Sequence, residues 1–163
     1  MSQDKKEFLI DRISDLVASL DNKEKRELFD HILEGKKDAI PISVFKARIS
    51  CLEIVVRYLK EIKPLSFKNI SKILNRSPST IYNTYSNSKA KFGGKLDLSN
   101  DSISIPFDIF SDRNFSMLET IAAYLKDKEH LSFNEISGFL EKSPSTIRTV
   151  YRRHKIKNKR SKK

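Results

Sequence analysis

The sequence predicts an all-α fold made of two tandem copies of a three-helix unit, preceded by an N-terminal helical hairpin. The first observation is an internal repeat. The stretch Ser-Pro-Ser-Thr-Ile occurs at residues 77–81 and 143–147, and about half of the aligned positions in 50–91 and 116–157 are identical. The second is a helical spacing of apolar residues. The third is a series of capping boxes, in which a serine precedes a glutamate by three residues. A repeat of this period indicates one supersecondary unit used twice.

Residues 1–39 are expected to form the helical hairpin. Apolar residues recur at helical spacing over residues 8–20 and again over 28–33. Asp21 and Glu24 form a capping box that starts the second helix. Two helices of this length cannot bury both apolar stripes by themselves. We therefore expect the hairpin either to pack on the following unit or to form a homodimer, and the sequence leaves these two outcomes open.

Each repeat is expected to contain three helices, in a first unit over residues 40–91 and a second unit over residues 105–157. Both units start with an Ile-Pro pair followed by apolar residues, which predicts a turn of helix or an extended segment beneath the unit. A capping box then opens the first helix of each unit. The boxes are Ser50 with Glu53 and Ser116 with Glu119.

The second and third helices of each unit are expected to be short and joined by a tight turn. Ser132 and Glu135 form the box that opens the second helix of the second copy. Ser77 and Ser143 cap the third helices, and each precedes a proline at the first helical position, where no backbone donor is needed. Two short helices joined by three or four residues are typical of the helix-turn-helix motif, whose second helix enters the major groove of DNA. A helical hairpin without a ligand has the same pattern, but the exposed face of the third helix is basic or polar in both copies, which favours DNA binding.

The pattern L-S-x-x-(E/N)-I-S-x-x-L-x-x-S-P-S-T-I resembles the sigma-70 region 4-like and homeodomain-like helix-turn-helix modules of prokaryotic regulators. The start of the third helix is also similar to the recognition helix of the lac repressor family. The chain departs from these modules at two places. Ser71 and Ser137 stand where a small alanine is usual, and Asn75 and Glu141 stand where the turn usually has glycine. The resemblance implies a transcriptional regulator and covers about 42 residues of each copy.

Charge is distributed unevenly along the chain, whose net charge is +11. Residues 41–91 carry ten basic and two acidic residues, and residues 142–163 carry ten basic and none acidic. The other two stretches are acidic, with a net charge of −2 over residues 1–40 and −5 over 92–141. Both basic stretches contain a predicted third helix, and such clustering favours a footprint on phosphates over an ordinary solvated surface.

The outward positions near the start of each third helix are the candidate DNA contacts, because recognition helices present these positions to base edges. We expect Arg148 to bind guanine with two hydrogen bonds and Asn83 to bind adenine. Contact of Arg148 with phosphate alone is the alternative. The full set of predicted DNA-binding residues is Ser77, Ser79, Thr80, Tyr82, Asn83, Ser86, Lys89, Ser143, Ser145, Thr146, Arg148, Thr149, Arg152, Arg153 and Lys155.

Two segments are expected not to fold into packed units of their own: the connection between the repeats and the C-terminal tail. Residues 92–104 contain two adjacent glycines and several Ser, Asn and Asp residues, a composition typical of a flexible or semi-flexible linker. Residues 158–163 form a basic tail, whose like charges oppose independent folding.

Other kinds of chemistry are poorly supported by the sequence. The three histidines have no cysteine or carboxylate partners at metal-ligand spacing, and no phosphate-binding glycine loop or catalytic triad can be placed. Cys51 corresponds to Met117 in the second copy, which indicates packing rather than nucleophilic chemistry. We therefore expect no enzyme activity, no cofactor and no metal site. The absence of a long apolar run excludes a membrane span, and the basic tail, with Ile156 as its only large apolar residue, lacks the amphipathic face that binds a membrane surface. With the single cysteine, these features predict a cytoplasmic, nucleoid-associated protein.

These features together predict a double-stranded DNA-binding protein, with sequence-specific regulation of transcription as the most natural role. One alternative is a DNA-binding factor for replication, partition or recombination. The other is an interaction module whose basic tail binds nucleic acid, including RNA, non-specifically.

Overall fold

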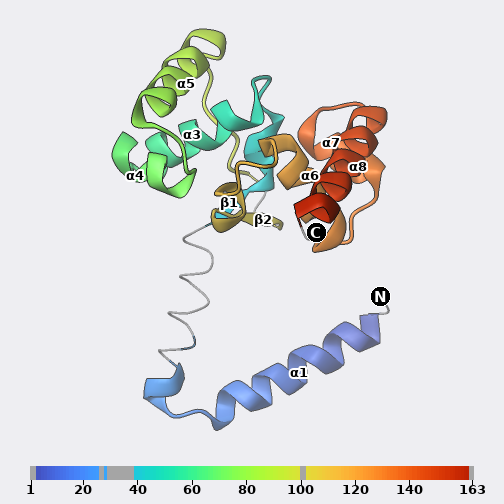
Figure 1. The fold of residues 1–163 in the computed structure, drawn as a ribbon. Coiled ribbons are helices and arrows are strands. Elements are labelled where there is room, and N and C mark those ends of the chain that lie inside the picture. The colour runs from blue at the N-terminus through green and yellow to red at the C-terminus, as the bar shows by residue number, and fades with distance from the viewer. Residues whose placement is uncertain (1–2, 26–27, 29–38, 100–101, 162–163) are drawn as a thin grey trace. The chain divides into compact units, whose positions relative to one another are not determined.

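The computed structural model describes residues 3–25, 28, 39–99 and 102–161. Over these residues the chain is mostly helical, with a single two-stranded sheet (Figure 1), which confirms the all-α class at this level. The chain divides into two compact units, Met1–Asp38 and Ala39–Lys163. The second unit therefore contains both copies of the repeat.

The first unit contains helix α1, Gln3–Ser19. Its described apolar side chains include Phe8, Ile13 and Leu16, all of which are exposed. The capping box predicted after this helix is present, because the Asp21 amide donates to the Glu24 carboxylate and the Glu24 amide donates to the Asp21 carboxylate. Most of the predicted second helix lies outside the described residues, so the packing or dimerisation of the hairpin remains a prediction.

The second unit contains two equivalent sets of elements, each made of a strand, a 3₁₀ helix and three α-helices. The first set is β1 (Ala39–Pro41), η1 (Ile42–Lys46), α3 (Cys51–Glu61), α4 (Phe67–Ile73) and α5 (Pro78–Lys91). The second set is β2 (Ser104–Pro106), η2 (Asp108–Phe110), α6 (Met117–Asp127), α7 (Phe133–Leu140) and α8 (Pro144–Ser161). The extended segment and the helical turn, predicted as alternatives for the start of each unit, occur one after the other: each strand contains the Ile-Pro pair, and a 3₁₀ helix comes after it.

Serine caps start these helices as the sequence predicts. Capping boxes open α3, α6 and α7, with both reciprocal hydrogen bonds present in each. Ser66 and Ser77 cap α4 and α5 through a side-chain oxygen that accepts one backbone amide. Each cap satisfies backbone donors that the first turn of a helix leaves without a partner.

One hydrophobic core joins the two sets. Strands β1 and β2 pair antiparallel, and α3 contacts α6. Fully buried residues from both repeats, such as Ile54, Leu59, Ile121 and Leu125, belong to the same cluster. The sequence predicts two units separated by a linker. The structure instead shows one compact body, because apolar side chains of both three-helix sets pack into a shared core.

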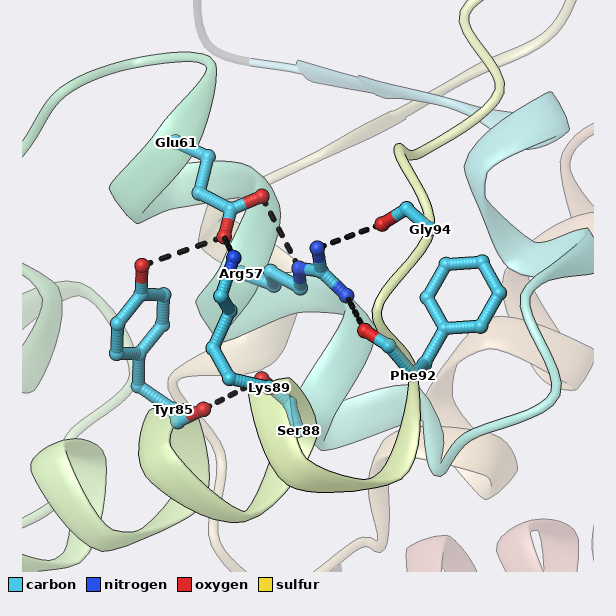
Figure 2. A network of polar contacts seen from close by, with 7 residues as sticks. All are labelled: Arg57, Glu61, Tyr85, Ser88, Lys89, Phe92 and Gly94. Carbon is cyan, nitrogen blue, oxygen red and sulfur yellow. Dashed lines mark hydrogen bonds and ion pairs between the residues drawn. The ribbon is translucent and has the colours of Figure 1, made fainter.

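The connection after α5 is held in place by Arg57, whose side chain is buried in α3 (Figure 2). Its guanidinium donates to the main-chain oxygens of Phe92 and Gly94 and to the carboxylate of Glu61. Further along, the Ser43 hydroxyl donates to the main-chain oxygen of Asp97 at 2.8 Å. The sequence predicts a flexible or semi-flexible linker over residues 92–104. Its first part is a docked segment, because the buried guanidinium of Arg57 binds its carbonyl groups.

The second repeat has Ala123 at the position equivalent to Arg57, and α8 runs on to Ser161. Most of the basic tail predicted at residues 158–163 is therefore the last turn of α8 in the structure. Lys157 helps to hold this helix by an ion pair of 2.7 Å with the buried Glu119, as Lys91 does with Glu53 in the first repeat.

Candidate nucleic-acid interface

The turns that lead into α5 and α8 have the same backbone geometry. Asn75 and Glu141 adopt left-handed backbone angles, with φ of 48° and 47°. The next amide closes each turn, since Arg76 donates to the Ser71 carbonyl at 2.9 Å and Lys142 donates to the Ser137 carbonyl at 3.2 Å. This six-to-one hydrogen bond is that of the Schellman motif, which usually has glycine at the left-handed position.

The two serines that stand in place of alanine are satisfied locally. The Ser71 hydroxyl donates to the Lys68 carbonyl at 2.7 Å, and the Ser137 hydroxyl donates to the Lys142 carbonyl at 2.6 Å. A buried hydroxyl without a partner would destabilise the fold. Because each hydroxyl finds a main-chain acceptor within its own helix or turn, both departures from the resembled pattern are compatible with the observed turn.

The first residues of α5 and α8 form matching hydroxyl clusters at exposed helix ends. Ser77 accepts the Thr80 amide, and its hydroxyl also contacts those of Ser79 and Thr80. The second copy repeats these contacts among Ser143, Ser145 and Thr146. Six of the predicted contact residues therefore lie together at the N-termini, where the helix dipole and backbone donors favour an anion such as phosphate.

The candidate base-reading side chains lie one turn further along. Tyr82 is 57% exposed, and its ring packs edge-on against Phe67 with 5.5 Å between centroids. In the second copy the guanidinium carbon of Arg148 lies 5.8 Å from the ring centroid of Phe133. An aromatic side chain at the start of α4 or α7 thus supports the equivalent residue of the next helix. Such support lowers the entropic cost of presenting a long side chain to a partner.

The remaining predicted contacts differ between the copies. Asn83 and Ser86 are exposed on α5, and Arg152 and Arg153 are exposed on α8. Thr149 is half-buried, and its hydroxyl donates to the Ser145 carbonyl at 2.9 Å. Arg152 and Arg153 form no ion pair among the described residues. The second copy therefore offers free cations where the first offers neutral polar groups.

Lys89 and Lys155 are bound to the body of the protein. Lys89 lies 3.4 Å from the Glu61 carboxylate and Lys155 lies 2.8 Å from that of Asp127. Burial acts to raise the pKa of Asp127, but the hydrogen bonds from Lys155 and Tyr151 hold that pKa below its ordinary value. These two predicted contacts have part of their charge neutralised within the chain. Their ion pairs with residues of α3 and α6 help to position the third helix of each repeat.

A cleft of about 960 Å³ lies where the two repeats meet, and matched residues of both copies line it. Arg76 and Lys142, the residues before the two cap serines, are among them. The Nε atom of Arg76 is buried without a hydrogen-bond partner in the described part of the chain. Lys142 is not among the contacts predicted from the sequence, although in both copies a basic residue directly precedes the cap serine.

Cys51 also lines the cleft. Burial raises the pKa of its thiol to about 11, which is consistent with a packing role.

Among the described residues, no helix has the length and apolar character needed to cross a membrane, and no group of three metal-ligating side chains gathers. No protein-family model, curated protein or solved structure matches the chain.

Proposed function

We propose that residues 39–163 bind double-stranded DNA through two helix-turn-helix units, α4–α5 and α7–α8, with α5 and α8 as recognition helices. The observation that carries the proposal is the match between the two helix pairs. Each has the same left-handed turn, the same hydroxyl-rich exposed cap and the same aromatic support for an outward side chain. A helical hairpin with a purely structural role has no need to keep these exposed features twice.

Electrostatics supports the same proposal. Helix α8 contains no acidic residue, and its exposed basic residues are spread along its length. A basic helix that also exposes hydrogen-bonding groups at its N-terminus suits a duplex, in which phosphates flank a groove lined by base edges. The role that follows is a sequence-specific transcriptional regulator of the sigma-70 region 4-like or homeodomain-like kind, acting on the nucleoid in the cytoplasm.

The test compares binding of the full chain to a labelled duplex of about 30 base pairs, the corresponding single strand and a structured RNA of equal charge. We expect the duplex to bind most tightly, with an affinity that falls steeply as salt rises. The variant Arg152→Glu/Arg153→Glu should lose this binding. Lys95→Glu/Lys128→Glu is the matched control, because it removes the same charge from exposed residues outside α5 and α8.

Tighter binding to RNA or to the single strand would contradict the proposal and favour the non-specific interaction module. An equal loss in both charge variants would show that net charge, and not α8, carries the binding. Genome-wide footprints at promoters would distinguish a regulator from a factor for replication, partition or recombination.

A further inference from the structure

The strand pairing places equivalent residues of the two repeats opposite one another. Ile40 pairs with Ile105, and these two residues occupy the same position in the two copies. On either side of this pair, Ala39 faces Pro106 and Pro41 faces Ser104. If the two strands are exchanged, each residue is replaced by its equivalent in the other repeat and the pairing register of the sheet stays the same. An antiparallel pair with this property has a two-fold axis through its centre.

Two arginines repeat this reciprocity at the turns. Arg48 and Arg113 follow the shared Ile-Pro pair at the same distance in their repeats. Arg48 lies 3.5 Å from the carboxylate of Glu141, and Arg113 donates to the main-chain oxygen of Asn75 at 3.0 Å. Each arginine thus reaches the left-handed turn residue of the other repeat. Contacts in which i meets j′ and j meets i′ define an isologous, two-fold interface.

The cleft between the repeats also brings equivalent residues together. Its lining contains Ser50 with Ser116, Cys51 with Met117 and Arg76 with Lys142, each a pair of equivalent residues. A head-to-tail arrangement would instead bring unlike surfaces together. The helices α5 and α8 lie on opposite sides of the centre that α3, α6 and the sheet form (Figure 1). The two candidate recognition helices are therefore related by rotation about a two-fold axis.

We propose that the DNA target contains two half-sites in inverted orientation about a central dyad, and that the two half-sites differ in base sequence. This inference rests on the proposed function. A two-fold protein binds B-DNA with its axis on a dyad of the duplex, so its phosphate contacts are symmetric and its half-sites are inverted. Tandem order in the sequence would otherwise suggest direct repeats.

The half-sites differ because the two helices present different side chains. Tyr82, Asn83 and Ser86 of α5 correspond to Arg148, Thr149 and Arg152 of α8. Asparagine forms its paired hydrogen bonds with adenine, whereas arginine forms them with guanine. The chain thus combines a symmetric phosphate footprint with asymmetric base readout. A symmetric homodimer cannot distinguish the two directions along DNA, whereas this single chain binds its site in one direction.

A helix-face transplant tests the arrangement through duplexes that the protein itself selects from a random library. The variant Arg148→Tyr/Thr149→Asn/Arg152→Ser gives α8 the outward face of α5, and the cap residues before it are already the same in both copies. The wild type and the variant each select from the same library. The wild type should enrich two unlike half-sites in inverted orientation. The variant should enrich a palindrome built from one of them, which it binds about tenfold or more tightly than the wild type does.

Selection of direct repeats by either protein, or of a single half-site, would overturn the inference while leaving DNA binding intact. Failure of the wild type to enrich any duplex would overturn the proposed function and the inference together. Phosphate-ethylation interference on the wild-type complex provides a second measurement that needs no variant. Interfering phosphates placed symmetrically about one dyad support the two-fold arrangement, and a pattern that repeats by translation refutes it.

Discussion

Arg57 shows how one buried side chain shapes the connection between the repeats. Its guanidinium is bound by Glu61 and by two main-chain oxygens, and it also lies over the Phe92 ring at 5.4 Å (Figure 2). We expect Arg57→Ala to lower the free energy of unfolding by about 2–4 kcal/mol, because the oxygens lose a charged donor and a cavity remains. Denaturant unfolding measures this change. Arg153→Ala, at an exposed position, should stay within about 0.5 kcal/mol of wild type, and equal losses in both variants would contradict the role given to Arg57.

We expect His154 to make the stability of the fold depend on pH. Its ring stacks on Phe115 with 4.1 Å between centroids. Burial and the nearby Lys155 lower its pKa below the ordinary value, against the opposing effect of carboxylates such as Asp127. The folded state thus binds this proton less readily than the unfolded state, so stability is full above the unfolded pKa and falls as pH drops below it, towards the lower folded pKa.

The measurement is denaturant unfolding of wild type and His154→Gln at about pH 7.5 and about pH 5.5, on either side of the ordinary histidine pKa. The wild type should lose more stability between the two values than the variant does. Buried carboxylates such as Glu119, whose pKa is lowered by Lys157 despite burial, act at more acidic pH and are common to both proteins. Equal losses would show that His154 does not control this pH range.

Substitution of Arg148 distinguishes base recognition from phosphate binding. If it binds a guanine with two hydrogen bonds, Arg148→Ala should weaken binding to the selected site by about 1–3 kcal/mol and relax one base position. Binding titrations on the selected site and on random duplex measure the difference. An equal loss on both duplexes would assign this residue to phosphate.

We expect α8 to supply most of the affinity and salt dependence of DNA binding, and α5 to supply most of the sequence specificity. Exposed cations neutralise phosphates and release counterions, whereas neutral polar groups bind bases with little salt dependence. Truncation after Asn158 removes four charges, those of Lys159, Arg160, Lys162 and Lys163. It spares Lys157, whose ion pair with Glu119 anchors the helix. The slope of log affinity against log salt should fall by up to about 4, with the ratio of specific to random binding little changed.

The matched variant is Tyr82→Ala/Asn83→Ala on α5, which changes no charge. It should lower the specificity ratio and leave the salt slope nearly intact, because neutral side chains release few counterions. A truncation that leaves the slope unchanged would refute this division between the helices. So would a double variant that weakens binding to all DNA alike.

The division of the chain into two compact units, Met1–Asp38 and Ala39–Lys163, leads to a prediction about stability and assembly. The shared core draws its buried residues from position 40 onward, so a fragment that starts at Ala39 should unfold cooperatively on its own. The exposed apolar side chains of α1 favour self-association of the full chain. Light scattering and thermal unfolding of both proteins test this. If both are monomers of equal stability, residues 1–39 neither dimerise nor brace the first repeat.

Local signals in the sequence were sufficient to place the described helices of the two repeats, whereas the DNA contacts of the third helices stay a prediction. The cap serines, the prolines that follow them and the apolar spacing act between residues about four positions apart, so each can be recognised along the chain. The repeat itself predicted that α5 and α8 would be equivalent. Ser79, Asn83 and Arg152 are exposed on these helices as that reasoning expected.

Contacts between distant residues settled the rest. The pairing of Ile40 with Ile105, the docking of residues 92–94 on Arg57 and the reach of Arg48 to Glu141 join parts of the chain that no local pattern relates. A repeated sequence is equally compatible with units placed by translation, by rotation or on a loose linker. The antiparallel pairing of equivalent residues and the reciprocal arginine contacts select the rotation. Burial of apolar residues from both copies in one core excludes the loose linker, because small three-helix units bury little surface when apart.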